Sequence, residues 1–308
     1  MPDAQIGLGL AALGRPAYIN VGHREDVADS SVEQMEHMAH AVLDAAYDGG
    51  VRWFDAARSY GRAEAFLASW LARRGLRPGE VTVSSKWGYR YTAGWRVDVA
   101  EHEVKDLSVE HFRTQWRETR DLLGDYLGLY QIHSATIDSG VLDDPAVRQE
   151  LDALRAGGIR VGLTVTGVDQ AATIDRALAT GGFDAVQATW NLYERAADAS
   201  LARAQEAGLR VLVKEALANG RLTARGADET LTATARERGA SEDAVALAAA
   251  LARPWADVVL SGAATVAQLE SNLSALDLAW DDELEQRLAD LGSESAAYWA
   301  ERAELPWT

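Results

Sequence analysis

The strongest constraint on the fold is a regular alternation of short apolar runs with longer helical patterns, repeated along the whole chain. Several of the short runs are apolar at nearly every position, which is typical of parallel strands buried on both faces. The predicted strands are Ile6–Ala12, Val51–Asp55, Val81–Lys86, Leu127–His133, Ile159–Thr164, Ala185–Trp190, Leu209–Lys214 and Asp257–Ser261. The predicted helices are Val32–Asp48, Arg62–Arg74, Val109–Leu123, Pro145–Ala156, Gln170–Thr180, Ala197–Ala207, Leu231–Arg238 and Val266–Leu276. Eight strand–helix repeats predict an α/β fold, a (β/α)8 TIM barrel.

The chain of 308 residues is expected to form a single domain, 1–308, because barrels of this kind commonly reach that length. Two extra helices are expected at Ala240–Ala252 and Asp281–Leu291. The tail, Ser293–Thr308, has no regular pattern but contains several aromatic residues. We therefore expect an irregular tail near the barrel mouth, which docks onto the body or closes over the mouth.

An open, doubly wound sheet is the alternative architecture. Its phosphate-binding fingerprint would have to lie at Gly7-x-Gly9-x-x-Ala12. This stretch is not followed promptly by a helix, and no acidic residue ends a second strand about 20 positions on, as that motif requires. The barrel is therefore the favoured prediction.

Composition excludes several functional classes. The sequence has no cysteine, which rules out disulfides, thiolate zinc sites and cysteine nucleophiles. The net charge of −17 argues against a broad surface for nucleic acid or anionic membrane, although a local pocket can still bind one phosphorylated cofactor. The N-terminus lacks a signal-peptide pattern, and no apolar run approaches the roughly 20 residues of a membrane span. We expect a cytoplasmic protein.

Four ionisable residues fall at or just after the ends of three successive predicted strands, where TIM barrels carry their catalytic groups. Asp55 ends the second strand and Tyr60 follows it, Lys86 ends the third strand, and His133 ends the fourth. Each has an ordinary structural explanation, such as a helix cap or a packed ring. A purely structural role is hardest to give to Lys86, because burying an unpaired ammonium is costly. Together the four indicate a site.

The combination suits reduction of a carbonyl by hydride. Tyr60 can give a proton to the developing alkoxide, but an unperturbed tyrosine pKa of about 10 is too high for efficient exchange near neutrality. The Lys86 ammonium would stabilise the phenolate and lower that pKa, while Asp55 would hold the lysine charged and in place. His133 can donate a hydrogen bond to the substrate oxygen and orient it.

These four residues, in this order and spacing, resemble the catalytic tetrad of the aldo-keto reductases, and the resemblance covers nearly the whole chain. It implies that Tyr60 is the general acid/base, that Lys86 and Asp55 tune it, and that His133 orients the carbonyl. It also implies a nicotinamide cofactor bound across the barrel mouth, with NADPH expected from the family and NADH left open. The matching or neighbouring cofactor positions are Thr164, Gln187, Lys214, Arg221, Gly262, Ala263, Gln268 and Asn272.

The sequence departs from the family pattern at three places. Val165 stands where the family usually has asparagine, so the amide is lost. Lys214–Glu215 stands where an aromatic residue usually stacks on the nicotinamide. The segment Ser261–Asn272 has no lysine or arginine for the 2′-phosphate of NADP, which leaves Arg221 and Arg225 as candidates, with a solvated role for both nearly as plausible.

Other aromatic and histidine residues carry weaker signals. Four tryptophans near the predicted mouth could form a wall for a flat or sugar-like substrate, and Trp190 or Trp87 could replace the missing stacking ring, although most tryptophans simply pack in cores. These are Trp87, Trp95, Trp190 and Trp299. His37 and His40 are three residues apart on a helix, but no third ligand is evident and no metal is expected. His102 lies in a polar stretch and is expected to be solvated.

The favoured prediction is an NAD(P)H-dependent oxidoreductase acting on a small carbonyl or alcohol substrate. One alternative is a regulatory or sensor barrel that binds the cofactor with little turnover. Another is a TIM-barrel lyase or isomerase in which Lys86 or Lys214 forms a Schiff base. Substrate, physiological direction and oligomeric state do not follow from the sequence.

Overall fold

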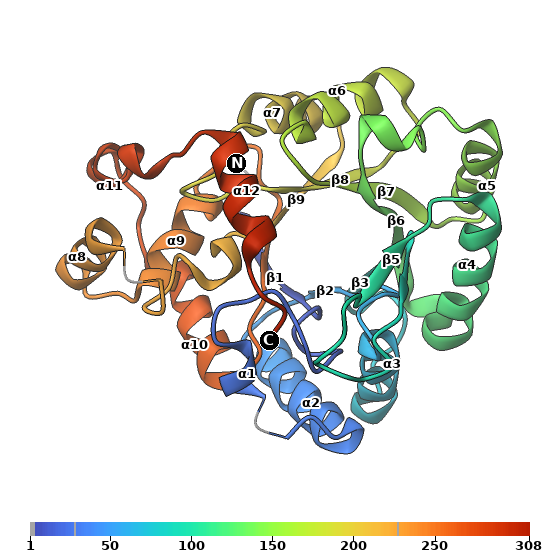
Figure 1. Ribbon diagram of the computed structural model, residues 1–308, viewed down its shortest axis with the longest axis horizontal. Coiled ribbons are helices and arrows are strands. Elements are labelled where there is room, and N and C mark those ends of the chain that lie inside the picture. Colours follow the sequence, from blue (N-terminus) through green and yellow to red (C-terminus); the bar gives the residue numbers. More distant parts are fainter. Residues whose placement is uncertain (1–3, 28, 227) are drawn as a thin grey trace.

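The computed structural model describes residues 4–27, 29–226 and 228–308. Within these residues, eight parallel strands close into a barrel with helices outside it, which confirms the predicted (β/α)8 fold (Figure 1). Each strand pairs with the next along the chain, and the last pairs with the first, with Gln5 opposite Val258. The barrel strands are β1 (Gln5–Gly9), β2 (Trp53–Asp55), β3 (Thr82–Trp87), β6 (Leu127–Ala135), β7 (Arg160–Val165), β8 (Ala185–Thr189), β9 (Arg210–Lys214) and β10 (Val258–Ser261).

The barrel interior has an apolar floor and a polar layer above it. A buried cluster of Trp53, Leu129, Ala185, Leu212, Val258 and Leu260 fills the floor. Because side chains alternate between the two faces of a strand, the residue two positions later on the same strand faces the same way. Asp55 follows Trp53 in this way, and Lys214 follows Leu212. The strand period therefore places the polar side chains at the C-terminal end of the barrel.

The helices cover the outside of the barrel, and most end at the predicted residues. The bounds of four helices match the prediction: α2 (Val32–Asp48), α4 (Val109–Leu123), α5 (Pro145–Ala156) and α6 (Gln170–Thr180). The others are α1 (His23–Asp26), α3 (Ala63–Arg74), α7 (Asp198–Glu206), α8 (Glu229–Arg238), α9 (Glu242–Leu251), α10 (Val266–Leu273) and α11 (Asp282–Arg287). Side chains of Ser31, Ser108 and Asp144 cap three of these helices, as the sequence signals indicate. No helix in the described part of the chain is long and apolar enough to cross a membrane.

Three segments differ from the prediction. The first strand ends at Gly9 rather than Ala12, because the chain turns there and the Leu13 amide bonds to the Leu10 carbonyl. A short antiparallel hairpin, β4 (Tyr89–Tyr91) with β5 (Glu103–Lys105), follows β3 and was not predicted. The tail is not irregular, because it contains helix α12 (Ser295–Glu304).

The C-terminal segment lies over the barrel mouth, one of the two placements expected for it. Figure 1 shows α12, in red, and the C-terminus above the side of the barrel formed by β9, β10 and β1. The Tyr18 and Thr308 backbones exchange two hydrogen bonds, of 3.1 and 3.2 Å, which fixes the last residue against the segment after β1. The tail therefore forms part of the wall of the barrel mouth.

Candidate active site

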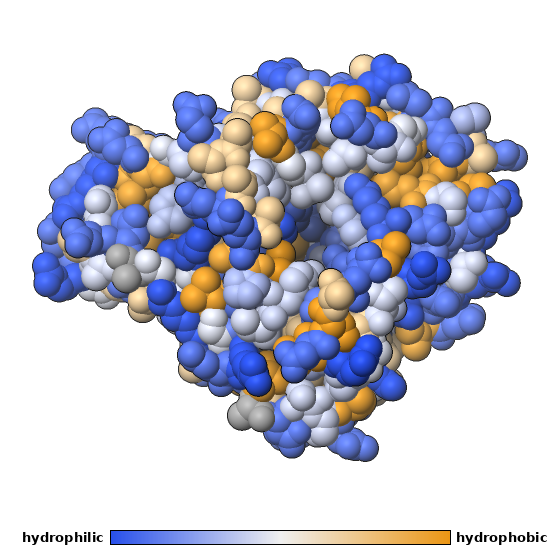
Figure 2. Space-filling view, in the orientation of Figure 1, coloured by the Kyte–Doolittle hydropathy of each residue, from blue (hydrophilic) through white to orange (hydrophobic). Residues whose placement is uncertain are grey.

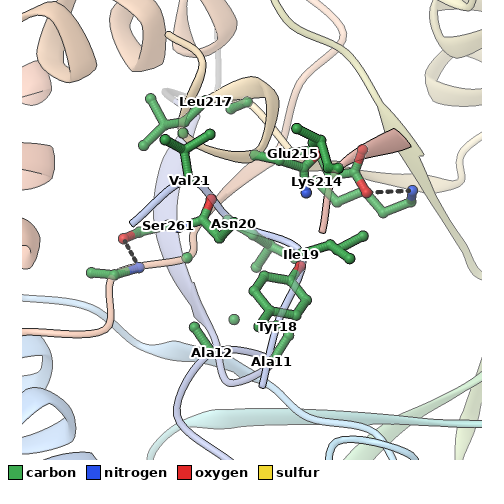
Figure 3. Close-up of a pocket in the computed structure, with 18 of the residues that line it drawn as sticks. Ala11, Ala12, Tyr18, Ile19, Asn20, Val21, Lys214, Glu215, Leu217 and Ser261 are labelled. Carbon is green, nitrogen blue, oxygen red and sulfur yellow. Dashed lines mark hydrogen bonds and ion pairs between the residues drawn. The ribbon is translucent and has the colours of Figure 1, made fainter. Parts of the chain in front are cut away.

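A cavity of about 650 Å³ opens at the C-terminal ends of the strands. Figure 2 shows it as a hollow near the centre of this face, and Figure 3 shows Tyr18–Val21 on one side of it and Lys214–Leu217 on another. Ten of the predicted site residues line it: Asp55, Tyr60, His133, Thr164, Gln187, Lys214, Gly262, Ala263, Gln268 and Asn272. The predicted residues Lys86 and Arg221 and the four predicted tryptophans are not part of its lining.

Asp55 and Lys86 form a buried ion pair at the base of the cavity. The Lys86 side chain is fully buried, and its Nζ bonds to Asp55 Oδ2 and, at 2.8 Å, to the Ala56 carbonyl. Asp55 Oδ1 accepts hydrogen bonds from Ser84 Oγ (2.6 Å) and Gln131 Nε2 (3.2 Å). With the carboxylate satisfied by three neighbours, the lysine is fixed in one position, as a buried charge requires.

Tyr60 lies directly above this pair. Its ring centre is 4.7 Å from Lys86 Nζ and 5.4 Å from the centre of the His133 ring, which meets it edge-on. Burial raises the pKa of Tyr60 well above its ordinary value, and the negative charge of Asp55 raises it further. In this structure Tyr60 is therefore a neutral phenol, the form that donates a proton.

His133 is held in its neutral form. Burial lowers the pKa of its imidazole well below the ordinary value, and the nearby cations Lys86 and Arg15 add to that effect. Its Nδ1 lies 3.5 Å from Ser59 Oγ, and its ring is packed edge-on against Tyr89, 4.9 Å away. A neutral imidazole has one N–H to donate, which suits hydrogen bonding to a substrate oxygen.

Arg15 is a cavity residue that the sequence analysis missed. It is only 2% exposed, and its Nη1 donates to Glu103 Oε2 (2.7 Å) and to the Ser59 carbonyl (3.2 Å). Its guanidinium carbon lies 5.1 Å from the centre of the Tyr60 ring and 4.7 Å from that of Trp307. An arginine in a glycine- and proline-containing turn gives no local signal of burial, because its partner Glu103 is 88 residues away.

The chemistry of the lining fits a nicotinamide dinucleotide. Gln187 is 1% exposed and lines the cavity, yet its Nε2 has no hydrogen-bond partner among the described residues. A buried amide without a partner is costly unless a ligand completes it, and the carboxamide of a nicotinamide can do so. At another part of the lining, a Cβ built on Gly262 would meet no atom within 4 Å, so the backbone there is open to a ligand. Thr164 Oγ1 accepts from the Ser134 amide (2.7 Å), while Val165 is fully buried in the core.

Lys214 and Glu215, which replace the usual aromatic residue at the end of β9, belong to a network of ion pairs. Glu215 accepts two hydrogen bonds from Arg302 Nε, at 2.9 and 3.1 Å, and one from Arg302 Nη2 at 2.5 Å. Lys214 Nζ donates to Thr189 Oγ1 (2.8 Å) and lies 3.9 Å from Glu215. Burial lowers the pKa of Lys214 to about 8. Arg302 belongs to α12, so this network ties the C-terminal helix to the cavity wall.

The structure departs from the expected tryptophan wall. Trp87 and Trp190 are fully buried, packed edge-on against Phe112 and Trp255. Trp95 donates from its indole to the Ser30 carbonyl, and Trp299, a buried residue of α12, packs edge-on against Tyr298 of the same helix. The rings that line the cavity are instead Tyr18, Tyr60, Tyr89 and Trp307. A tryptophan at a strand end can face either the helices or the barrel interior. Here Trp87 and Trp190 pack in the core outside the cavity.

Two polar residues also differ from expectation. His102 is 6% exposed, because its ring stacks on Trp307 at 4.4 Å, and is not solvated. Arg221 pairs with Glu301 at 2.8 Å and packs over Tyr298, outside the cavity lining. Arg225 does line the cavity. His40 packs within the helical layer, where its Nε2 lies 2.9 Å from Ser69 Oγ.

Comparisons with known proteins agree with this architecture. The model of the aldo/keto reductase family matches residues 5–292. An uncharacterized oxidoreductase, YrpG, from Bacillus subtilis (strain 168) is 26% identical over 296 residues, spanning 84% of this chain and 88% of the relative. The holo form of the aldo-keto reductase AKR11C1 from Bacillus halodurans has a TM-score of 0.72 at 21% identity, covering 94% of this chain and 92% of that one. The glycerol dehydrogenase AKR11B4 from Gluconobacter oxydans has a TM-score of 0.70 at 19% identity, covering 93% and 90%. At these identities the two solved structures show a shared fold.

Proposed function

Because the chain belongs to the aldo/keto reductase family, whose members are nicotinamide-dependent oxidoreductases, we propose that it transfers hydride to and from a small carbonyl or alcohol substrate, with Tyr60 exchanging the proton. The observation that carries this proposal is the convergence of Tyr60, Asp55 and His133 in the lining of one cavity, with Lys86 buried directly behind Asp55. The orphaned amide of Gln187 supports a cofactor in the same cavity.

In the direction of reduction, a nicotinamide cofactor held in this cavity would be the source of the hydride for the carbonyl carbon. The neutral imidazole of His133 donates a hydrogen bond to the carbonyl oxygen and aligns it with Tyr60. As negative charge develops on that oxygen, the Tyr60 phenol gives up its proton to it, which produces the alcohol and leaves a phenolate. The Lys86 ammonium and the Arg15 guanidinium stabilise that phenolate, because both lie about 5 Å from its ring. Alcohol oxidation is the reverse, with the phenolate as the base.

The first test is a titration of the purified protein with NADH and NADPH, followed by quenching of tryptophan fluorescence. Saturable binding of either cofactor, followed by substrate-dependent oxidation of that cofactor in a screen of aldehydes and ketones, is the expected result. Failure to bind reduced or oxidised cofactor in any form would overturn the proposal.

One observation favours a second candidate, a Schiff-base lyase or isomerase. Lys214 lines the cavity, and its pKa of about 8 leaves about a tenth of the amine neutral and nucleophilic at pH 7. Lys86 is less suited, because its ammonium is bound to Asp55 and the Ala56 carbonyl. Borohydride trapping with carbonyl compounds, followed by mass spectrometry, separates the two. A substrate-dependent adduct on Lys214 with turnover that needs no nicotinamide would favour the lyase.

A further inference from the structure

The cavity has a second charged region, on the side formed by β10 and the helices packed against it. Its lining includes Arg225, Gln268 and Asn272 of α10, and Asp243 of α9. The reacting nicotinamide must lie beside Tyr60. The region near α9 and α10 is therefore left for the adenosine half of the cofactor. This placement of the adenosine half rests on the proposed function.

The Arg225 guanidinium is already neutralised by a carboxylate. Its Nη1 and Nη2 donate to the two oxygens of Asp26, at 2.8 and 2.6 Å, in the two-pronged arrangement that arginine forms with carboxylates and phosphates alike. Asp26 Oδ2 also accepts from Gln268 Nε2 at 2.8 Å. The Asp26 side chain is only 8% exposed, and these hydrogen bonds lower the pKa of its carboxyl. Asp26 is therefore a fixed anion behind Arg225 and Gln268.

Among the described residues, the charged side chains of this region carry a net negative charge. Asp243 lines the cavity as a second carboxylate, and Asn272 can donate to it at 2.7 Å while accepting from Ser261 Oγ at 2.8 Å. Burial lowers the pKa of the neighbouring His23 to about 4, so this histidine adds no positive charge near neutral pH. This region thus holds one guanidinium, paired with Asp26, and a second carboxylate, Asp243.

We propose that this region selects NAD(H) over NADP(H), with Asp26 as the residue that discriminates. A 2′-phosphate carries close to two negative charges at neutral pH and needs cationic donors. Arg225 could offer the phosphate its full guanidinium charge only by leaving Asp26, which would strand a nearly buried carboxylate beside the phosphate. The ribose hydroxyls of NAD instead donate hydrogen bonds, which a carboxylate in the lining such as Asp243 accepts, while Asp26 keeps Arg225 neutralised behind it. This preference is opposite to the NADPH expected from family likeness.

The decisive experiment compares dissociation constants of the wild-type protein for NADH and NADPH, measured by fluorescence quenching without substrate. At least tenfold tighter binding of NADH is expected. NADPH binding as tight as NADH, or tighter, would overturn the inference while leaving the proposed function intact. If neither cofactor binds, the proposed function itself fails, and the inference fails with it.

Variants assign the discrimination to Asp26. In Asp26→Ser, Arg225 is released for a phosphate, so NADPH should bind at least tenfold more tightly and the preference for NADH should shrink or reverse. The double variant Asp26→Ser/Arg225→Met should lose that gain. Glu25→Ser is the matched control, because it removes a nearby negative charge without touching the Asp26–Arg225 pair, and its preference should stay within about twofold of wild type. An unchanged preference in a folded Asp26→Ser protein, with folding checked by circular dichroism, would exclude Asp26 as the discriminating residue.

Discussion

The guanidinium of Arg15 lies 5.1 Å from the centre of the Tyr60 ring, on a segment that packs directly against the tyrosine loop. The Gly14 carbonyl accepts a hydrogen bond of 2.7 Å from the Arg62 amide, and a Cβ on Gly14 would come within 2.2 Å of the Tyr60 carbonyl. The turn after β1 and the turn after β2 are thus in close contact, and that contact brings a second cation, besides Lys86, to the phenol. Arg15 opposes the rise that burial causes in the Tyr60 pKa.

Replacing Arg15 should therefore change the pH profile of the reaction. Without this cation the pKa of Tyr60 rises further, so the phenolate needed for alcohol oxidation forms only at higher pH. In Arg15→Gln, the rise of kcat/KM for oxidation should move up by about one pH unit. Arg15→Lys should restore most of the wild-type profile, whereas a purely structural role for Arg15 would lower the rate without moving the profile.

Tyr60→Phe should abolish nearly all turnover while leaving cofactor affinity within about twofold of wild type. Loss of a positioned general acid typically costs about 10²- to 10⁴-fold in rate. Steady-state kinetics and the fluorescence titration measure the two effects separately. Tyr91→Phe is a suitable control, because Tyr91 lies on the hairpin outside the cavity lining and its hydroxyl only accepts a bond from the Trp95 amide. Wild-type turnover in Tyr60→Phe would remove this residue as the proton donor.

Much of the fold could be predicted because the signals that determine it are local. Buried parallel strands show as short apolar runs, and helix α5 is marked by Asp144 and Pro145 at its start and Gly157 at its end. The same periodicity brought Asp55, Tyr60 and His133 to one cavity, because strand ends in a parallel barrel share one edge. Their catalytic roles stay predictions.

The features that were missed depend on contacts between distant parts of the chain. Arg15 is buried by Glu103, and His102 by a ring at position 307. Helix α12 has no side-chain cap at Glu294, and it is stabilised by packing and by the pair between Arg302 and Glu215. Such pairings leave no periodic pattern in the sequence. The pairing of Asp26 with Arg225, which are 199 residues apart, cannot be predicted from the sequence for the same reason.

The ion pair between Glu215 and Arg302 should make the free energy of unfolding fall at acid pH. The nearby Lys214 and Arg302 cations and its hydrogen bonds overcome the effect of burial and lower the pKa of Glu215 from 4.5 to about 2. A lowered carboxyl pKa stabilises the folded state fully above pH 4.5, and this contribution, about 3 kcal/mol, is lost as the pH falls from 4.5 towards 2. The free energy of unfolding, measured in urea between pH 6 and pH 2.5, should depend less on pH for Glu215→Gln than for wild type. Parallel curves would contradict the role given to this pair.

Variants of the Asp55–Lys86 pair should separate its effect on stability from its effect on turnover. Lys86→Met leaves the carboxylate of Asp55 buried without its cation, which should cost about 3–5 kcal/mol in unfolding free energy. The double variant Asp55→Asn/Lys86→Met removes both charges and should recover a large part of that loss, because the two residues are in direct contact and their effects are not additive. Turnover should not recover, since the phenolate of Tyr60 would still lack the ammonium 4.7 Å from its ring. Denaturant titration and kinetics on Lys86→Met, Asp55→Asn and the double variant test this separation. Recovery of turnover together with stability would mean that the pair only supports the fold and that Lys86 has no electrostatic part in the proton transfer.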